Sequence, residues 1–235
     1  AGEAIKHRMC LRWWNHRLSQ CGLQAQYLPG DVQSGELVVA LVEVVTGQRV
    51  PLDQAYISSP RERLLWAVGM LRSARIPLVS TAAGRAARGS GGAAKPVKGI
   101  DTYTTLANDL EFGSWEAVEN LTWSLILYTD VWTTSHSPIE ALAELLDWVR
   151  RTTRGYESVE IGPTRRSWSA CFSSGLAWCA LLHSYNPSLI SYTEVLKLAP
   201  LERVRAVFQI AFERLGVPML STAEDVLTNE PRVAI

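Results

Sequence analysis

The sequence has no surplus of charge and no long apolar run. Its 23 basic and 23 acidic residues give a formal net charge of zero, so no overall field attracts nucleic acid. No apolar stretch reaches the ~18 consecutive residues that a membrane helix needs, and we expect no signal peptide. A hydrophobic share of 47% against 20% charged residues nevertheless supports a packed core. We therefore expect one large globular domain or two smaller ones.

Patterns typical of catalysis or metal binding are also missing. The 4 cysteines and 4 histidines do not stand at the spacings of metal ligands, and no Gly-x-Ser-x-Gly nucleophile motif occurs. We expect reduced thiols in the core, as is typical of the cytosol, and a structural role for His183 in its apolar helix. The sequence thus predicts no enzyme, no cofactor and no metal site.

Two similar apolar stretches occur in the two halves of the chain. They read SGELVVALVEVV at residues 34–45 and SSGLAWCALLHSY at residues 173–185. Further matching pairs follow in the same order: Trp13 with Trp148, and IPLVS at 76–80 with VPMLS at 217–221. Ordered pairs at nearly constant separation indicate a duplicated unit rather than a chance likeness between apolar helices.

The spacing of apolar residues predicts that the repeated unit is helical. Leu142, Leu145, Leu146 and Val149 recur on one face of a helix that follows the start signals Ser137, Pro138 and Glu140.

Residues 37–45 and 176–182 are apolar on nearly all sides, which is typical of a helix wrapped by its neighbours. Gly47 and Asn186-Pro187 then end these helices. We expect an all-α fold of two compact bundles, each around a buried central helix.

The two copies differ in two places. The first contains an insert at about 81–105, rich in Gly, Ala and Arg, which we expect to be a flexible loop. It is not a phosphate-binding loop, because Ser90 stands where the lysine belongs and no strand precedes it. The first copy also continues into a long helix from Ser114, whereas we expect the matching final helix of the second copy to be truncated.

The ordered motifs resemble the tandem calponin homology (CH) domains of the α-actinin, spectrin and filamin family. LRWWNHRL at 11–18 is similar to the opening helix of that family, and residues 31–50 resemble its central-helix signature. Residues 109–129 align with its last helix and place Trp123 on the family tryptophan. The resemblance implies a first CH domain at 5–129, a linker at 130–137 and a second CH domain at 138–235. Where the family has Asp-Gly, both copies have Ser-Gly, and we expect the serine to cap the central helix instead.

The resemblance implies a cytoplasmic, cytoskeleton-associated module that binds F-actin through its first domain, with the second domain tuning affinity. The rest of a longer protein is expected on the C-terminal side. The alternative is a divergent module that binds tubulin or a scaffold protein. Glu116 and Glu119 favour the alternative, because the family often has lysine and small residues there and the surface of actin is acidic.

The basic opening helix is the candidate filament-binding surface. Its residues are Lys6, Arg8, Arg12, His16 and Arg17. Such a stripe suits an acidic polymer, although a solvated helix face has the same composition. Trp115 stands beside the insert, either as a partner-binding anchor or packed under the insert.

Two further features complete the predicted sites. Arg150, Arg151 and Arg154 suit a filament or the acidic headgroup of a phosphoinositide, although basic residues at a helix end also complement the helix dipole. We favour that structural interpretation. Trp132 lies in the predicted linker, where it can insert between the two domains as they open and close.

Overall fold

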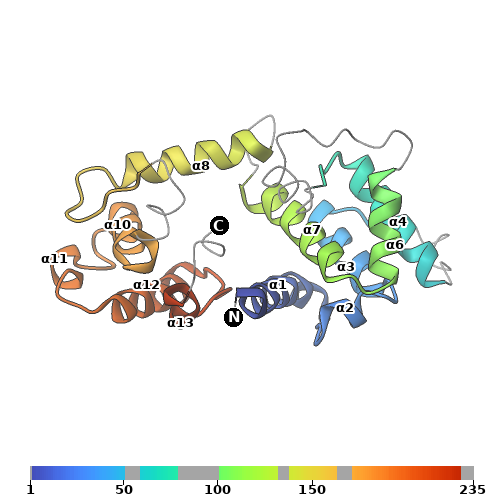
Figure 1. Cartoon of the computed structure of the whole chain (residues 1–235), viewed down its shortest axis with the longest axis horizontal. Helices are drawn as coiled ribbons and strands as arrows, with labels where there is room; N and C mark the ends of the chain where they lie inside the picture. The colour runs from blue at the N-terminus through green and yellow to red at the C-terminus, as the bar shows by residue number, and fades with distance from the viewer. Residues whose placement is uncertain (1, 51–58, 79–100, 132–137, 163–170, 229–235) are drawn as a thin grey trace, which may run out of the picture. The chain divides into compact units, whose positions relative to one another are not determined.

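Every regular element in the described part of the chain is helical, which confirms the predicted all-α fold (Figure 1). The computed structural model describes residues 2–50, 59–78, 101–131, 138–162 and 171–228. The elements are α1 (Gly2–Leu18), η1 (Ser19–Cys21), α2 (Leu28–Asp31), α3 (Glu36–Thr46), α4 (Pro60–Ser73), α6 (Thr102–Glu111), α7 (Trp115–Ile126), η3 (Leu127–Val131), α8 (Pro138–Thr152), α10 (Leu176–Tyr185), α11 (Tyr192–Val195), α12 (Pro200–Leu215) and α13 (Ala223–Leu227). None of these helices is long and apolar enough to cross a membrane.

Contacts divide the chain into two compact units. The first unit comprises residues 13–142, and the second comprises residues 1–12 together with 143–235. Helix α1 therefore contributes its beginning to the second unit and its end to the first. The family resemblance implied other boundaries, at 5–129, 130–137 and 138–235. These follow the sequence repeat rather than the contacts, and they stay a prediction.

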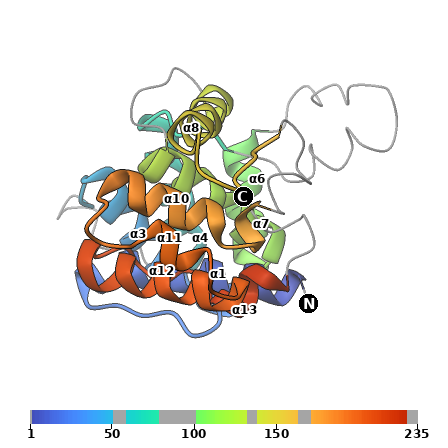
Figure 2. The same ribbon diagram turned by 90° about the vertical axis from the view of Figure 1, so that its left-hand side faces the viewer.

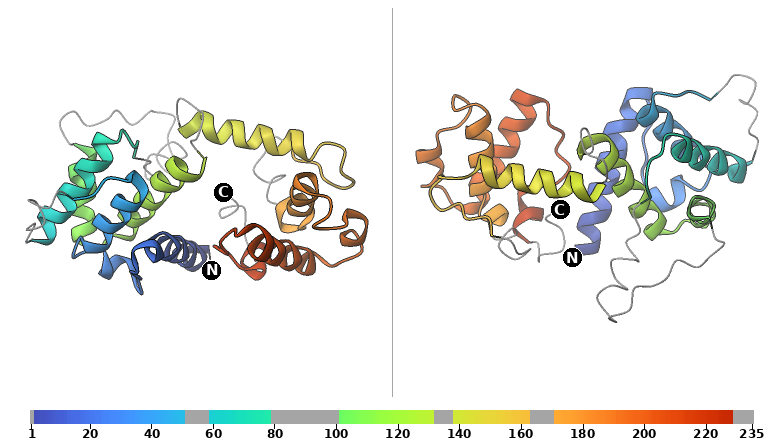
Figure 3. Two further views of the ribbon diagram at one scale, coloured as in Figure 1. Left: turned by 180° about the vertical axis from the view of Figure 1, so that it is seen from behind. Right: turned by 90° about the horizontal axis from the view of Figure 1, so that it is seen from above.

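Helix α3 is the central helix of the first unit, as its apolar sequence predicts. Val38, Leu41 and Val42 are fully buried on it. Helix α4 lies side by side with both α3 and α6 (Figures 1 and 3). Gly47, with a φ of 69°, ends α3 as expected.

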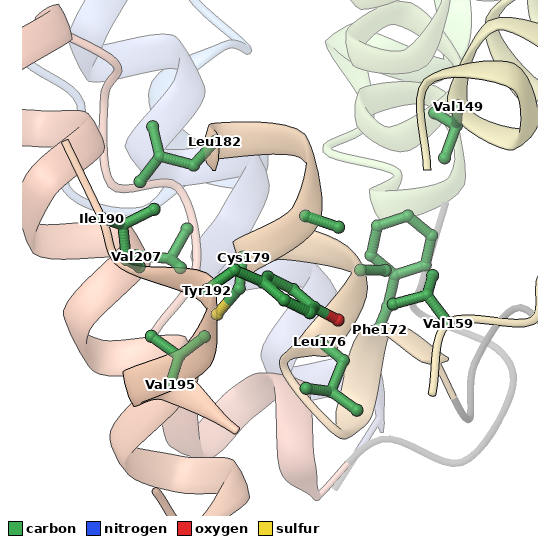
Figure 4. Packing of buried hydrophobic residues seen from close by; sticks show 12 residues of the cluster. Val149, Val159, Phe172, Leu176, Cys179, Leu182, Ile190, Tyr192, Val195 and Val207 are labelled. Carbon is green, nitrogen blue, oxygen red and sulfur yellow. The ribbon is translucent and has the colours of Figure 1, made fainter. Parts of the chain in front are cut away.

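Helix α10 has the same role in the second unit. It packs beside α12, which also contacts α13 (Figure 2). Leu176 and Cys179 of α10 meet Val195 of α11 and Val207 of α12 in one hydrophobic cluster (Figure 4). Asn186 follows the last residue of α10, which is the predicted end. Each unit is thus built around a buried central helix.

His183 on α10 has the structural surroundings predicted for it. Its Nδ1 lies 2.8 Å from the hydroxyl oxygen of Tyr156, and its ring also packs beside Tyr192. The Tyr192 hydroxyl donates to the carbonyl of Glu157 at 2.8 Å, and burial raises the pKa of Tyr192 to about 12. The histidine therefore belongs to a packed aromatic cluster.

A glycine begins each central helix at a point of close approach. Gly35 has a φ of 77°, and a Cβ built on it would lie 2.7 Å from Cβ of Arg63. Gly175 has a φ of 81°, and its Cβ would lie 2.7 Å from Cβ of Arg203. Both the left-handed backbone and the lack of space require glycine here. The duplication seen in the sequence therefore extends to a matching contact in three dimensions.

The serines that precede these glycines do not occupy the N-cap position, which corrects the prediction. The glycine itself is the N-cap in both helices and makes no side-chain cap bond. The Ser34 hydroxyl accepts instead from the backbone N–H of Glu36 at 3.3 Å, and the Ser174 hydroxyl accepts from that of Leu176 at 3.3 Å. The positive φ of the glycine moves the chain so that the serine reaches the first helical residue only.

Helix α8 begins at Pro138 as predicted, and its expected apolar face is partly covered. Val149 is buried, whereas Leu145 is 39% exposed and Trp148 is 48% exposed. Ser137 lies outside the described residues. In the first unit, α7 and the turn after it cover α1, and among the described residues of the second unit no helix corresponds to α7. The apolar pattern therefore predicted a helix correctly but not the burial of all its apolar side chains.

Two smaller predictions also need correction. Residues 102–105, expected within the flexible insert, form the first turn of α6, because the Asp101 side chain accepts from the backbone N–H of Tyr103 at 3.3 Å and caps the helix. The part of the insert up to residue 100 lies outside the described residues. Cys21 is exposed rather than part of the core, because it follows the last buried residue of α1 in a short surface turn.

Candidate functional site

The end of α1 is anchored in the first unit by two buried tryptophans. Trp13 and Trp14 are 2% and 0% exposed. The indole Nε1 of Trp14 donates to the hydroxyl of Thr122 on α7 at 2.8 Å, and the Thr122 hydroxyl donates to the carbonyl of Val118 at 2.7 Å. A buried indole N–H needs such a partner. This bond therefore sets the rotation of α1 and with it the direction of the basic side chains.

Arg17 is part of a network around Trp13. It forms an ion pair with Asp130 and donates to the Thr129 hydroxyl at 3.1 Å. Its guanidinium carbon lies 5.5 Å from the centre of the Trp13 ring, within the range of a cation–π contact. Asp130 also accepts from Nε1 of Trp13 at 3.1 Å. Arg17 is thus held by three groups of the first unit, Asp130, Thr129 and the Trp13 ring, rather than extended into solvent.

Arg8 and Arg12 both approach Asp225 at the start of α13. Arg8 forms an ion pair with Asp225. Nη1 of Arg12 lies 3.9 Å from the same carboxylate and donates to the carbonyl of Leu220 at 3.3 Å. Burial alone raises the pKa of Asp225, but hydrogen bonds from Arg8 and Thr222 outweigh it and leave that pKa below its ordinary value. Two of the predicted filament-binding cations therefore share one buried carboxylate.

The other two basic positions on α1 differ in their surroundings. Nζ of Lys6 lies 3.6 Å from the carboxylate of Glu3 one turn earlier. His16 is exposed in the last turn of the helix. Most of the basic side chains of α1 therefore pair with carboxylates of the same chain. Of the two predicted contacts in the last turn of α1, His16 is exposed and Arg17 is half-buried.

Glu119 corrects the prediction of two carboxylates on an outward face of α7. Its side chain is buried, with 5% exposed, whereas Glu116 is exposed. Seven residues of α7 are buried, Thr122 and Ser124 among them, so the helix is enclosed on most sides. A helix enclosed in this way has no wide solvent face, and only Glu116 of the pair is available at the surface.

Trp115 packs against an aromatic neighbour that the sequence did not suggest. It is the first residue of α7, after the cap residue Ser114. Its ring meets Tyr27 edge to face, with ring centres 6.3 Å apart. Tyr27 is 60% exposed, so the pair lies at the surface.

The basic cluster at the end of α8 is partly matched within its own helix. Arg151 pairs with Asp147 at 2.9 Å, one turn earlier. Arg150 reaches the carbonyl of Gly162 at 3.4 Å, and Arg154 is exposed. Trp132, the predicted interdomain residue, lies outside the described residues.

Asp130 and Asp225 are the partners of the candidate cations that the sequence did not indicate. Asp225 has a local signal, since the spacing from Thr222 is that of a capping box, and the structure contains both of its bonds. No local pattern links it to Arg8, which is separated from it by 217 positions. Long-range ion pairs of this kind depend on how elements pack and leave no periodic trace.

Comparison with known proteins agrees with this architecture. Residues 140–235 match the family model of the calponin homology (CH) domain. The chain is 26% identical over 232 residues to α-actinin-3 of Mus musculus and of Homo sapiens, which is 99% of this chain and 23% of each relative. It is 26% identical over 227 residues to α-actinin-1 of Gallus gallus. The chain therefore spans about a quarter of the length of these relatives. Residues 140–235 are thus similar to a CH domain, and the whole chain, with its two helical units around matching central helices, is distantly similar to the α-actinins.

Proposed function

We propose that this module binds actin filaments through its first CH domain and that the second CH domain tunes the affinity. Association with the cytoskeleton follows from this proposal. The observation that carries it is the number of basic residues on one 17-residue helix, α1, which holds Lys6, Arg8, Arg12, His16 and Arg17. Cations carried on one helix are suited to an acidic polymer, and their attraction speeds association.

The contacts of Asp225 support a tuning role for the second domain. Asp225 belongs to the α13 end of the chain and engages Arg8 and Arg12 of α1. A filament that uses the same arginines must compete with this carboxylate. Binding would then depend on the balance between the intramolecular pair and the filament contact. Loss of the carboxylate should strengthen binding.

The burial of Glu119 weakens the case for the alternative partners, tubulin or a scaffold protein. That case depended on two carboxylates at the surface of α7, and only Glu116 is exposed there. One exposed carboxylate costs less electrostatic complementarity with an acidic filament than two. Trp115 and Glu116 remain proposed contacts at the edge of this surface.

Co-sedimentation with F-actin tests the proposal, with microtubules in parallel and at two salt concentrations. The chain should pellet with actin, and added salt should weaken the binding. Arg12→Glu and Arg17→Glu should lower the pelleted fraction, and Asp225→Asn should raise it. Lys197→Glu is the matched control, because Lys197 is an exposed cation of the second unit paired with Glu194.

The outcomes separate the proposals. Pelleting with microtubules but not with actin would replace actin by tubulin as the partner. Pelleting with neither would leave a scaffold protein as the partner. If Asp225→Asn binds actin as the unaltered chain does, the second domain does not act through this carboxylate. Circular dichroism of each variant establishes that the helices are intact.

A further inference from the structure

A patch of exposed apolar side chains lies at the end of α12. We call it the α12 patch, and it consists of Phe212, Leu215, Val217 and Met219. These side chains are 53%, 40%, 49% and 45% exposed. Single exposed apolar residues are common on protein surfaces, but a group of neighbouring ones favours an interaction site.

The backbone holds the α12 patch in one conformation. Gly216, with a φ of 69°, ends α12, and its N–H donates to the carbonyl of Phe212 at 3.2 Å. The N–H of Val217 donates to the carbonyl of Ala211 at 3.1 Å, so Val217 lies against the last turn of the helix. Because these bonds fix the turn, little conformational entropy would be lost when the patch binds a partner.

The equivalent turn in the first unit is buried. The motif IPLVS of the first copy pairs with VPMLS of the second, so Ile76 and Val217 are counterparts. Ile76 is fully buried, whereas Val217 is half exposed. A residue with a left-handed backbone precedes each of them, Arg75 with a φ of 56° and Gly216 with a φ of 69°. The two turns therefore share this backbone conformation, but only the turn of the first unit is covered.

Helix α6 contributes the cover of this turn in the first unit. It lies side by side with α4 (Figure 1), and the hydroxyl of Tyr103 on α6 donates to the carbonyl of Ile76 at 2.7 Å. The buried residues of α6 are Leu106, Ala107 and Leu110, which share one face at helical spacing. An amphipathic helix therefore packs over the turn that follows α4.

An ion pair joins the start of α6 to the end of α4. Asp101, the N-cap of α6, pairs with Arg72 in the last turn of α4. Helix α12 has Arg214 in its last turn. The Arg214 side chain is exposed and forms no ion pair with the described residues, and its neighbour Glu213 accepts from Nε2 of Gln209 at 2.9 Å. The α12 patch therefore has a cation beside it that suits the carboxylate of an incoming helix.

In the second unit, the short helix α13 follows the turn in place of α6. Helix α13 has 5 residues, whereas α6 has 10. Glu224 of α13 pairs with Arg205 on an earlier part of α12. No helix other than α13 follows α12 in the described part of the second unit. The repeat therefore contains the turn twice, but among the described residues it contains a long helical cover only once.

We propose that the α12 patch binds an amphipathic helix of a partner protein, as α4 and its turn bind α6. Such a helix begins with a carboxylate at its N-cap, which pairs with Arg214, and continues with an aromatic residue and leucines on one face, which pack on Phe212 and Val217. The apolar anchors supply most of the binding energy, and the ion pair sets the direction of the helix. No residue of the patch belongs to α1 or α7, so the inference does not depend on filament binding.

Isothermal titration calorimetry of the whole chain with a synthetic peptide tests the proposal. The probe is a peptide of residues 101–112, DTYTTLANDLEF, which contains α6 and its cap. The matched control peptide has serine in place of Tyr103, Leu106 and Leu110, which removes the apolar face and keeps the charge. The α6 peptide should bind, and the serine peptide should not.

Variants of the α12 patch show where the peptide binds. Phe212→Ser and Val217→Ser should each weaken binding about tenfold, because each removes apolar surface from the contact. Leu198→Ser is the matched control, since Leu198 is also exposed but precedes α12 at its other end, and it should leave binding unchanged. Arg214→Glu should weaken binding, and a peptide with Asp101→Lys should restore it.

The proposal is overturned if the α6 peptide does not bind or if the serine peptide binds equally well. It is also overturned if Val217→Ser and Leu198→Ser have the same effect, because the peptide then binds elsewhere, such as in the position of α6 itself. Analytical ultracentrifugation tests a second copy as the occupant, and a dimer that Val217→Ser dissociates would replace the partner helix. Because the substituted side chains are exposed, an unchanged circular dichroism spectrum verifies that each variant is folded.

Discussion

Gly35 and Gly175 impose the same steric requirement at matching positions of the two units. Each starts a central helix with a positive φ, and each leaves no room for a side chain against the helix that follows. Arg63 donates from Nε to the carbonyl of Ser34 at 2.6 Å, so the same arginine also satisfies the backbone beside the first glycine. In each unit, the arginine that leaves no room for a side chain on the glycine also donates to the carbonyl of the serine before it.

Gly35→Ala should lower the free energy of unfolding by about 2–4 kcal/mol, since it adds both backbone strain and a steric clash. Gly47→Ala is the control, because Gly47 also has a positive φ but nothing lies within 4 Å of its added Cβ. It should cost about 1 kcal/mol. Urea unfolding of the two variants measures the difference, and equal losses would contradict the proposed clash.

At the scale of elements, α1 and α8 are counterparts in the repeat, but their matching tryptophans differ in burial. Trp13 on α1 is 2% exposed, and Trp148 on α8 is 48% exposed. The difference arises because the segment from α7 to Asp130 covers Trp13 and supplies a carboxylate for its indole N–H. Sequence equivalence therefore does not imply equal burial.

Trp13→Ala should lower the free energy of unfolding by about 3–5 kcal/mol, the range for removal of a large aromatic side chain from a core. Trp148→Ala should lower the free energy of unfolding by well under half of that amount, because about half of the Trp148 surface is already exposed to water. Thermal or urea unfolding followed by circular dichroism compares the two variants. A similar loss for both would contradict the difference in burial between the two tryptophans.

The contact between α1 and α13 makes stability depend on pH. The pKa of Asp225 in the folded chain is lowered, so its ionised form contributes stability above the pKa of an unfolded aspartate, near 3.9. That contribution is lost as pH falls through the lower folded-state pKa.

Asp225→Asn should therefore reduce the free energy of unfolding at pH 7 by about 1 kcal/mol, a value discounted for the exposure of Arg8. Below about pH 4 the difference from the unaltered chain should shrink. Urea midpoints between pH 7 and pH 3 measure both effects. Glu194→Gln serves as the control, because it removes an exposed carboxylate paired with Lys197. The interpretation fails if both variants change equally with pH.

At the scale of the whole molecule, the central proposal is a balance between two domains. Helix α1 contributes residues to both units: Arg8 pairs with Asp225 within one unit, and Arg17 pairs with Asp130 within the other. A change in the linker should therefore affect binding without any contact to the partner. Trp132, predicted to insert between the domains, is the residue on which this expectation depends.

Trp132→Ala should increase the average separation of the two domains and change the affinity for F-actin. Small-angle X-ray scattering measures the separation, and co-sedimentation measures the affinity. Trp148→Ala is a suitable control, since it removes an exposed indole outside the linker. The role of Trp132 is refuted if both measurements match those of the unaltered chain.

The sequence by itself determined the all-α fold, the duplication, the buried central helices and their ends at Gly47 and Asn186. These features depend on local periodicity and on backbone preferences, which neighbouring residues encode. Only the tertiary structure decided that Arg8 meets Asp225, that Glu119 is buried, and that Phe112 and Trp148 are exposed. Such properties depend on which element covers which face, and that depends on residues far apart along the chain.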